Sequence, residues 1–453
     1  MIRRDAVKIL SALTALIPGY TAKTVSAESR KRPLCFEYIS QVTALIEKIR
    51  ANESDNMLEA SYNIARTYKN GGNCFSQWET GHSFDGDMFP NRHGGTGIFK
   101  MGYTMGKPGA EPKEGDLLLV NVIRKPLDDP RGKGIFVIGG ETPWCGDTPQ
   151  TEILIQRNRD LRIKQFSDIW IDFHITTYGA LLWLPGETAP LGPTSGALGM
   201  ITYWAMVADA VRMLARDGIA VTVKGDAPAV GDNEPRVSLT KPLAEDYFAE
   251  CIKQIGQIKA EYGTIKAIAS SAVDCILSGG KLYVYSRYRE ALSSEANAKR
   301  GGLALINTTH AEDKNFTGTE KDFMIMGIYQ PDDEIDIRML KKFRKTVMKI
   351  ASIGPATRGG TVPDSETVPG STDFHLGLMC DTYGLFAVPG VDKKVCPTSG
   401  LLANQLLWAT MIQIAEDIMT RTGDTPGVLS TGAIIGGGDQ RRRRNEMVKV
   451  RGY

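Results

Sequence analysis

The sequence lacks the features that mark a metal centre, a nucleic-acid partner or a membrane span. Its five histidines and seven cysteines show no C-x-x-C, His-x-x-x-His or His-Glu-x-x-His spacing, and the glycine cluster at 436–438 lacks the Gly-x-Gly-x-x-Gly spacing of a dinucleotide site. The formal net charge of +2 is too small to favour a nucleic-acid partner. We therefore expect no metal, no cofactor and no nucleic acid.

No apolar run after residue 27 approaches the roughly 18 to 20 residues that a membrane span needs. The longest candidate, residues 201–214, is interrupted by Asp209 and Arg212 and predicts a buried helix. With 453 residues at 42% hydrophobic and 23% charged, the chain has enough apolar material for two cores of ordinary size. We expect two domains and no membrane span in the mature chain.

The cysteines are odd in number and scattered along the chain. Most are expected to be small core residues. One disulfide in each half, from Cys35 and Cys74 or from Cys251 and Cys275, stays open.

The first 27 residues resemble an export signal. Arg3 and Arg4 precede an apolar stretch at 9–17, and the small residues at 25–27 suit a cleavage site. The paired arginines are typical of the twin-arginine class, and the alternative is the basic start of an ordinary helix. We expect a mature chain from residue 28 that is periplasmic or extracellular.

Several short motifs occur twice. The pairs are Pro-Thr-Ser-Gly at 193–196 and 397–400, Asp-Phe-His at 172–174 and 373–375, Gly-Gly at 71–72 and 279–280, and a basic pair followed by Gly-Gly at 92–95 and 299–302. Repeats this long indicate two copies of a whole domain. We expect domains over 28–224 and 243–453, joined by a linker over 225–242 that is rich in Pro, Gly and Asp.

Helix and strand patterns alternate within the second copy. Helices are expected at 243–261, 265–277, 293–300 and 336–347, and strands at 281–286, 303–307, 322–328 and 349–353. Such alternation favours a mainly parallel sheet with helices on both faces. The expected fold class is α/β, with two three-layer α-β-α domains.

The order of these motifs resembles that of SIS (sugar isomerase) domains. Thr-Gly-His-Ser at 80–83, the basic pair with Gly-Gly at 92–95 and the Pro-Thr-Ser helix openings match the subgroup with a Gly-Thr-Gly-His-Ser loop. The resemblance covers about residues 35–450. It implies two tandem SIS-like domains that bind a sugar or phosphosugar between the packed copies.

The sequence departs from this subgroup where a phosphate would bind. The second loop of such domains, Ser-x-Ser-Gly, is replaced by Asn-Val-Ile-Arg-Lys-Pro at 121–126 and by Gly-Ile-Tyr-Gln-Pro-Asp at 327–332. The hydroxyls and amides that would hold a phosphate are missing there. We therefore expect a sugar without phosphate, in agreement with export, and Trp78 as a platform for one sugar face.

The expected binding residues lie where helices begin. Backbone N–H groups and the positive end of a helix dipole suit an anionic or polyhydroxyl ligand, and the alternative is that these residues only cap their helices. The candidate substrate-binding residues are Gly81, His82, Ser83, Asp85, Thr194, Ser195, Thr398 and Ser399.

Isomerisation of a sugar needs a base that removes a proton beside a carbonyl and an acid that moves protons on oxygen. The candidate catalytic residues are Glu295 or Asp87 as the base and His93, His174 or His375 as the acid, with His82 as a further acid. Because Asp-Phe-His occurs in both copies, His174 and His375 are expected to share a position. The alternative is that each only hydrogen-bonds a sheet edge.

Two function classes follow. The first is an exported sugar isomerase or a related acid/base lyase. The second is a catalytically inactive sugar-binding or regulatory protein that keeps the fold. Packing between the copies supplies the contact that single domains obtain by dimerising, and a homodimer stays open.

Overall fold

The structure, a computed structural model, describes residues 32–78, 94–101, 112–121, 131–140, 163–175, 179–187, 189–225, 227–287, 292–296, 301–313, 316–346, 349–358, 361–363, 366–380 and 383–429. The export signal expected at 1–27 lies outside these ranges. So do the candidate residues Gly81, His82, Ser83, Asp85, Asp87 and His93.

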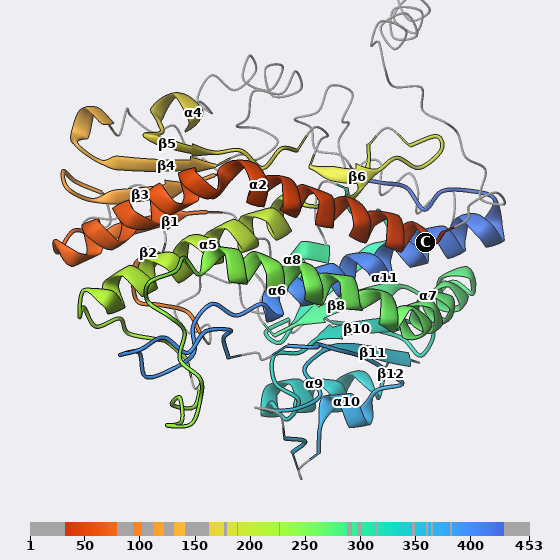
Figure 1. The fold of residues 1–453 in the computed structure, drawn as a ribbon. Coiled ribbons are helices and arrows are strands. Elements are labelled where there is room, and N and C mark those ends of the chain that lie inside the picture. Colours follow the sequence, from red (N-terminus) through yellow and green to blue (C-terminus); the bar gives the residue numbers. More distant parts are fainter. Residues whose placement is uncertain are drawn as a thin grey trace, which may run out of the picture. The chain divides into compact units, whose positions relative to one another are not determined.

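Each half of the chain builds a parallel five-stranded sheet (Figure 1). The first has the order β2 (Phe99–Met101), β1 (Cys74–Gln77), β3 (Leu117–Val120), β4 (Phe136–Gly140) and β5 (Ile169–Ile171). The second has the same order: β9 (Ile306–His310), β8 (Leu282–Ser286), β10 (Phe323–Gly327), β11 (Lys349–Gly354) and β12 (Phe374–Gly377). The predicted α/β class with parallel sheets is confirmed.

The helices follow the same plan in both halves. The first half contains α2 (Leu34–Lys69), the short η3 (Arg131–Lys133) and α4 (Ile163–Phe166), the antiparallel pair β6 (Ala180–Leu182) and β7 (Leu191–Pro193), and α5 (Ser195–Arg216). The second contains α6 (Ala244–Gln257), η4 (Ile258–Glu261), α7 (Tyr262–Leu277), α8 (Leu292–Ala296), α9 (Glu334–Phe343), α10 (Val368–Ser371) and α11 (Ser399–Thr422). The long α2 thus corresponds to the run of α6, η4 and α7.

The long helices of the two halves share one apolar core. α2 packs on β1, β3 and β5, while α7 and α11 pack on the second sheet. α2 also contacts α5, α6 and α11, so these helices lie between the two sheets (Figure 1). One buried cluster therefore runs from the first sheet to the second.

Matching aspartates hold the amino ends of both sheets. Asp116 accepts a hydrogen bond from the backbone N–H of Asn73 at 2.8 Å, and Asp322 accepts one from Lys281 at 2.7 Å. The Asp116 contact joins the residue before β1 to the residue before β3, and the Asp322 contact joins the residue before β8 to the residue before β10. These contacts are what two copies of one domain would produce.

The repeated Gly-Gly motif has a packing role at this edge. A Cβ on Gly72 would lie 2.6 Å from the carbonyl oxygen of Gly115, and a Cβ on Gly280 would collide with the carbonyl oxygen of Lys321. Only glycine allows the backbones to approach this closely. The motif is therefore repeated for packing, at the amino ends of the strands.

Helix α5 has the length and apolar composition of a membrane span, but its apolar window is completely buried in the fold. Inside it, Asp209 and Arg212 form a buried ion pair at 2.8 Å. Asp209 also accepts a hydrogen bond from the backbone N–H of Leu243 at 2.8 Å, at the start of α6. The predicted buried helix is confirmed, and the hydrogen bond from Leu243 to Asp209 ties the second half to the first.

The described cysteines are free thiols. Five are buried and Cys380 is partly exposed. Burial raises the pKa of Cys35 and of Cys74 to about 12. The prediction of small core cysteines is thus confirmed for most of them.

Candidate functional site

The strand order locates the place where each sheet can bind a ligand. In a sheet of order 2-1-3-4-5 the connections diverge between the first and third strands, and ligands bind at the carboxyl ends there. In the first sheet this point follows β1 and β3, and in the second it follows β8 and β10.

In the first half, Trp78 fills this edge. Its side chain is buried at 4% exposure, and its indole N–H donates to the carbonyl of Gly199 at 2.9 Å. The ring meets Phe173 edge-on at 5.7 Å. The expectation that Trp78 offers an open platform to a sugar is wrong, because the side chain is buried and its indole N–H is already bonded inside the fold.

In the second half, a serine stands at the position of Trp78. Ser286 ends β8, and its hydroxyl donates to the hydroxyl of Ser293 at 2.7 Å. The backbone N–H of Ser293 donates back to Ser286 at 3.0 Å. The two hydroxyls join the end of β8 to α8, with small polar side chains where the first half has an indole.

Glu295 lies on α8 as a buried carboxylate, only 5% exposed. Its Oε1 accepts a hydrogen bond from the indole N–H of Trp408 on α11 at 2.9 Å. Helix α8 contacts β8, β9 and α11, so Glu295 is held between the sheet and the last helix. Of the two predicted base candidates, it is the one within the described residues.

His310, which the sequence analysis did not select, lies on the same face of the second sheet. It ends β9 and pairs in register with Ser286. Parallel partners in register share a face, and here that face also carries Leu282, Val284 and Ile306 of the main core. The Nδ1 atom of His310 is buried without a hydrogen-bond partner. The sequence feature that could have identified His310 is its place three residues after the strand expected at 303–307.

His375 lies on the opposite face of the second sheet from α8. It pairs with Ser352 in the register of β11 and β12, and its Nδ1 lies 2.9 Å from the Ser352 hydroxyl. Burial lowers the pKa of His375 to about 4, so the ring is neutral at pH 7. The structure therefore does not bring His375 together with Glu295.

His174 and His375 do not share a position, contrary to the expectation from their motif. Asp168 and Asp373 each accept a backbone N–H of the neighbouring strand at 2.8 Å, from residues 137 and 350. This equivalence makes Trp170 the counterpart of His375, whereas His174 follows the end of β5. The shared Asp-Phe-His motif therefore does not place the two histidines at equivalent positions of their strands.

His174 instead pairs with a residue of α2. Its Nε2 lies 3.2 Å from Oε1 of Glu53, within ion-pair distance but not aligned as a hydrogen bond. Its backbone takes the left-handed conformation, with φ of 54°, and its N–H donates to Asp172 at 2.5 Å. This pair belongs to the first half, away from Glu295 in the second.

The predicted threonines precede the two long helices as expected. Thr194 and Thr398 stand at the first position before α5 and α11, but neither side chain caps its helix. Thr194 and Thr398 are buried, as is Ser399, whereas Ser195 is partly exposed. The capping alternative is therefore wrong for the two threonine side chains.

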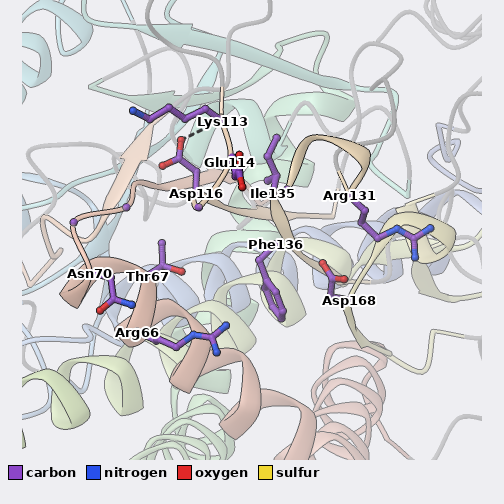
Figure 2. Close-up of a pocket in the computed structure, with 14 residues that line it drawn as sticks. Arg66, Thr67, Asn70, Lys113, Glu114, Asp116, Arg131, Ile135, Phe136 and Asp168 are labelled. Atoms are coloured by element: carbon purple, nitrogen blue, oxygen red, sulfur yellow. Dashed lines mark hydrogen bonds between the residues drawn. The ribbon is translucent and has the colours of Figure 1, made fainter.

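A depression of about 730 Å³ opens at the other edge of the first sheet (Figure 2). Arg66, Lys113 and Arg131 face it together with Asp116 and Asp168. The two aspartates already accept backbone N–H groups. Because the depression lies at the amino ends of the strands, it is separate from the switch point.

No protein-family model matches the chain, and no curated protein matches it significantly. Among solved structures, it is similar to a proposed phosphosugar isomerase from Clostridium difficile, with a TM-score of 0.49 and 10% identity over 88% of this chain and 96% of that one. It is also similar to the C-terminal domain of glucosamine-fructose-6-phosphate aminotransferase from Francisella tularensis, with a TM-score of 0.43 and 10% identity over 86% and 98% of the two chains. A third similar structure is glucosamine-6-phosphate deaminase from Thermotoga maritima, with a TM-score of 0.38 and 11% identity over 86% of this chain and 96% of that one. The fold of this chain is α/β, with two parallel five-stranded sheets of the same strand order.

Within this α/β fold, the residues that carry the candidate site come from segments far apart in the sequence. The described ranges contain no group of three His, Cys, Asp or Glu side chains placed to hold a metal ion. At the carboxyl edge of the second sheet they include the buried carboxylate of Glu295, the hydroxyls of Ser286 and Ser293, and His310. Such groups can move a proton and hydrogen-bond a polyhydroxyl ligand.

Proposed function

We propose that the protein binds a sugar derivative at the carboxyl edge of the second sheet and isomerises it with Glu295 as the base. The observation that carries this proposal is the buried carboxylate of Glu295, held by Trp408 at the switch point of the sheet. A buried carboxylate at such a point is a common feature of acid/base sites.

The chemistry needs one carboxylate and one group that handles protons on oxygen. Glu295 takes the proton from the carbon beside the carbonyl, an enediolate forms, and Glu295 then delivers a proton to the neighbouring carbon. In D₂O the protonated carboxyl exchanges with solvent in part of the turnovers, so deuterium enters the sugar. His310 is proposed to move the proton between the two oxygens, because it lies on the face of α8 and its Nδ1 has no partner. No atom is gained or lost, as isomerisation requires.

The charges near the second switch point support a ligand without phosphate. Arg287 pairs with Asp333 at 2.6 Å, and Arg358 pairs with Asp332 at 2.7 Å. Among the described residues, both of these arginine charges are thus matched by a carboxylate. Such a pair offers little net attraction to a phosphate dianion.

The proposed location follows from the first 27 residues. A twin-arginine-like signal would place the mature protein in the periplasm or outside the cell, where free sugars are more available than phosphorylated ones. Export and the unphosphorylated ligand are thus two parts of one proposal.

A second candidate is a sugar-binding protein without turnover. Its support is the asymmetry of the described residues in the two halves. A buried Trp78 stands at the first switch point, where the second half has Ser286 and its hydroxyl. Loss of one site is what a protein reduced to binding would show.

Proton exchange separates the two candidates. The full chain is incubated in D₂O with D-glucose, D-fructose, D-glucosamine, N-acetyl-D-glucosamine and the 6-phosphates of the first three. NMR follows loss of the C2 proton signal of the aldoses and of the C1 proton signals of fructose and fructose 6-phosphate. Glu295→Gln keeps an acceptor for Trp408 and should lower exchange by about 10²- to 10⁴-fold. Glu312→Gln, an exposed carboxylate on the same half, should change nothing.

Each outcome decides between the candidates. Exchange that depends on Glu295 supports the isomerase. A thermal shift with a sugar but no exchange supports the binding protein. No shift and no exchange with any of these sugars would reject both.

A further inference from the structure

A buried polar cluster lies where the two halves of the chain meet. Tyr38 of α2 and Asn404 and Gln405 of α11 are all fully buried, at 0% exposure. The Tyr38 hydroxyl donates to the carbonyl of Pro193 at 2.8 Å. The Gln405 amide N–H donates to Asn404 Oδ1 at 3.0 Å and reaches the Tyr38 hydroxyl at 3.5 Å.

Each of the two amides keeps one atom without a partner. Nδ2 of Asn404 and Oε1 of Gln405 are buried and make no hydrogen bond. Exchanging N and O in both amides still leaves one orphan on each side chain, and exchanging them in one amide alone breaks the hydrogen bond between the two. Burying an unpaired polar atom is costly, so such atoms call for an explanation beyond folding.

The first half shows that the fold does not require polar groups at these positions. Counting from Thr194 and Thr398, the residues of α5 that match Asn404 and Gln405 are Met200 and Ile201. Both are buried and apolar. The copies therefore share the helix but differ in these two side chains.

The cluster belongs to the same helix face as the residue that holds Glu295. Trp408 lies three and four positions after Gln405 and Asn404, so the three side chains project from one face of α11. Trp408 donates to Glu295 at 2.9 Å. The pKa of Tyr38 is raised, mainly by burial and further by the charge of Glu295. The amides, the tyrosine and the carboxylate are therefore neighbours.

We propose that Asn404 and Gln405 select the ligand, with their unpartnered amide atoms donating to and accepting from hydroxyl groups of the sugar derivative that Glu295 acts on. This inference rests on the proposed function. One N–H donor beside one C=O acceptor matches a neutral polyhydroxyl ligand, whose hydroxyls both donate and accept. Tyr38 brings the first half into the same site.

The test replaces each amide with an apolar side chain of similar shape, Asn404→Leu and Gln405→Met, singly and together. Thr410→Val is the matched control, because Thr410 is buried on the same helix and its hydroxyl bonds the carbonyl of Leu406 at 2.8 Å. Two quantities are measured for each variant: the thermal midpoint without ligand, and the affinity for those sugars of the panel above that stabilise the wild type.

We expect the variant that carries both substitutions to gain about 1 to 4 °C in its midpoint, since both unpaired buried atoms are removed together with the hydrogen bond that joins the amides. A single substitution instead leaves the other amide without its partner. We expect the single and double variants to lose at least about tenfold in sugar affinity. The control should bind the sugars as the wild type does and should not gain stability.

A lower midpoint with unchanged affinity would overturn the inference, because it would show that the amides support the fold, for example through a buried water. Unchanged affinity in variants of a protein that does bind sugar would overturn the inference and leave the proposed function standing. A wild type that binds none of the sugars would overturn both.

Discussion

The neutral histidine of the second sheet makes the stability of the protein depend on pH in a calculable way. His375 lies against Ser352, and burial lowers its pKa to about 4, whereas an unfolded histidine has a pKa of about 6.5. Between these values the unfolded chain binds more protons than the folded one. The free energy of unfolding therefore rises with pH in this window. The contribution of His375 is fully present above about pH 6.5 and is lost as the pH falls toward 4.

The size of the effect follows from the two pKa values. Lowering the pH from 7 to 4.5 should cost about 2 to 3 kcal/mol through this one side chain, as an upper value for a partly buried ring. Carboxylates titrate in the same range, so the wild type alone does not isolate the histidine. His375→Gln keeps a polar group beside Ser352 but does not titrate, and the difference between the two proteins reports on His375.

The assay is urea unfolding of both proteins at pH 7 and pH 4.5, followed by circular dichroism. The wild type should lose about 2 to 3 kcal/mol more than His375→Gln on acidification. Ser352→Ala should keep the pH dependence of the wild type, because burial and not the hydrogen bond lowers the pKa. Equal losses in the wild type and His375→Gln would refute the reasoning.

Three further predictions test the packing. Asp209→Asn leaves Arg212 buried without its partner and should lower the free energy of unfolding by about 3 to 5 kcal/mol, while Glu366→Gln, in an exposed ion pair, should have no measurable effect in the same urea titration. Gly72→Ala places a Cβ 2.6 Å from a carbonyl oxygen and should cost about 1 to 3 kcal/mol; an unchanged midpoint would show that the backbone there adapts. In a Cys145→Ser background at pH 8, Ellman's reagent should modify Cys380 and leave the five buried thiols unreacted, and rapid reaction of more than one thiol would contradict their burial.

The α/β class could be predicted from the sequence because it depends on local patterns. Alternating helix and strand segments favour a parallel sheet whatever the distant contacts are. The strand expected at 322–328 appears as Phe323–Gly327, and the one at 349–353 appears as Lys349–Gly354. The helix expected at 336–347 instead runs from Glu334 to Phe343, because Asp333 caps its start.

Register and burial were decided only by the tertiary structure. The Asp-Phe-His repeat suggested one shared position, but hydrogen bonds between strands pair Asp373 with Asp168 and displace the two histidines. In the sequence Trp78 was a candidate sugar platform, but in the fold its ring is buried against Phe173. A three-residue match carries no information on the neighbouring strand, which supplies the register.

The candidate site shows the same division. Glu295 could be selected from its distance to a glycine pair, because that spacing is local in the sequence. Asn404 and Gln405 read as part of an apolar helix, and only the approach of Tyr38 and Glu295 shows where their amides lie. Local patterns in the sequence were enough to predict the α/β class and to select Glu295 as a candidate. The packing of α2, α8 and α11, segments more than 100 residues apart in sequence, decided which polar groups meet it, because contacts between distant segments form only in the folded chain.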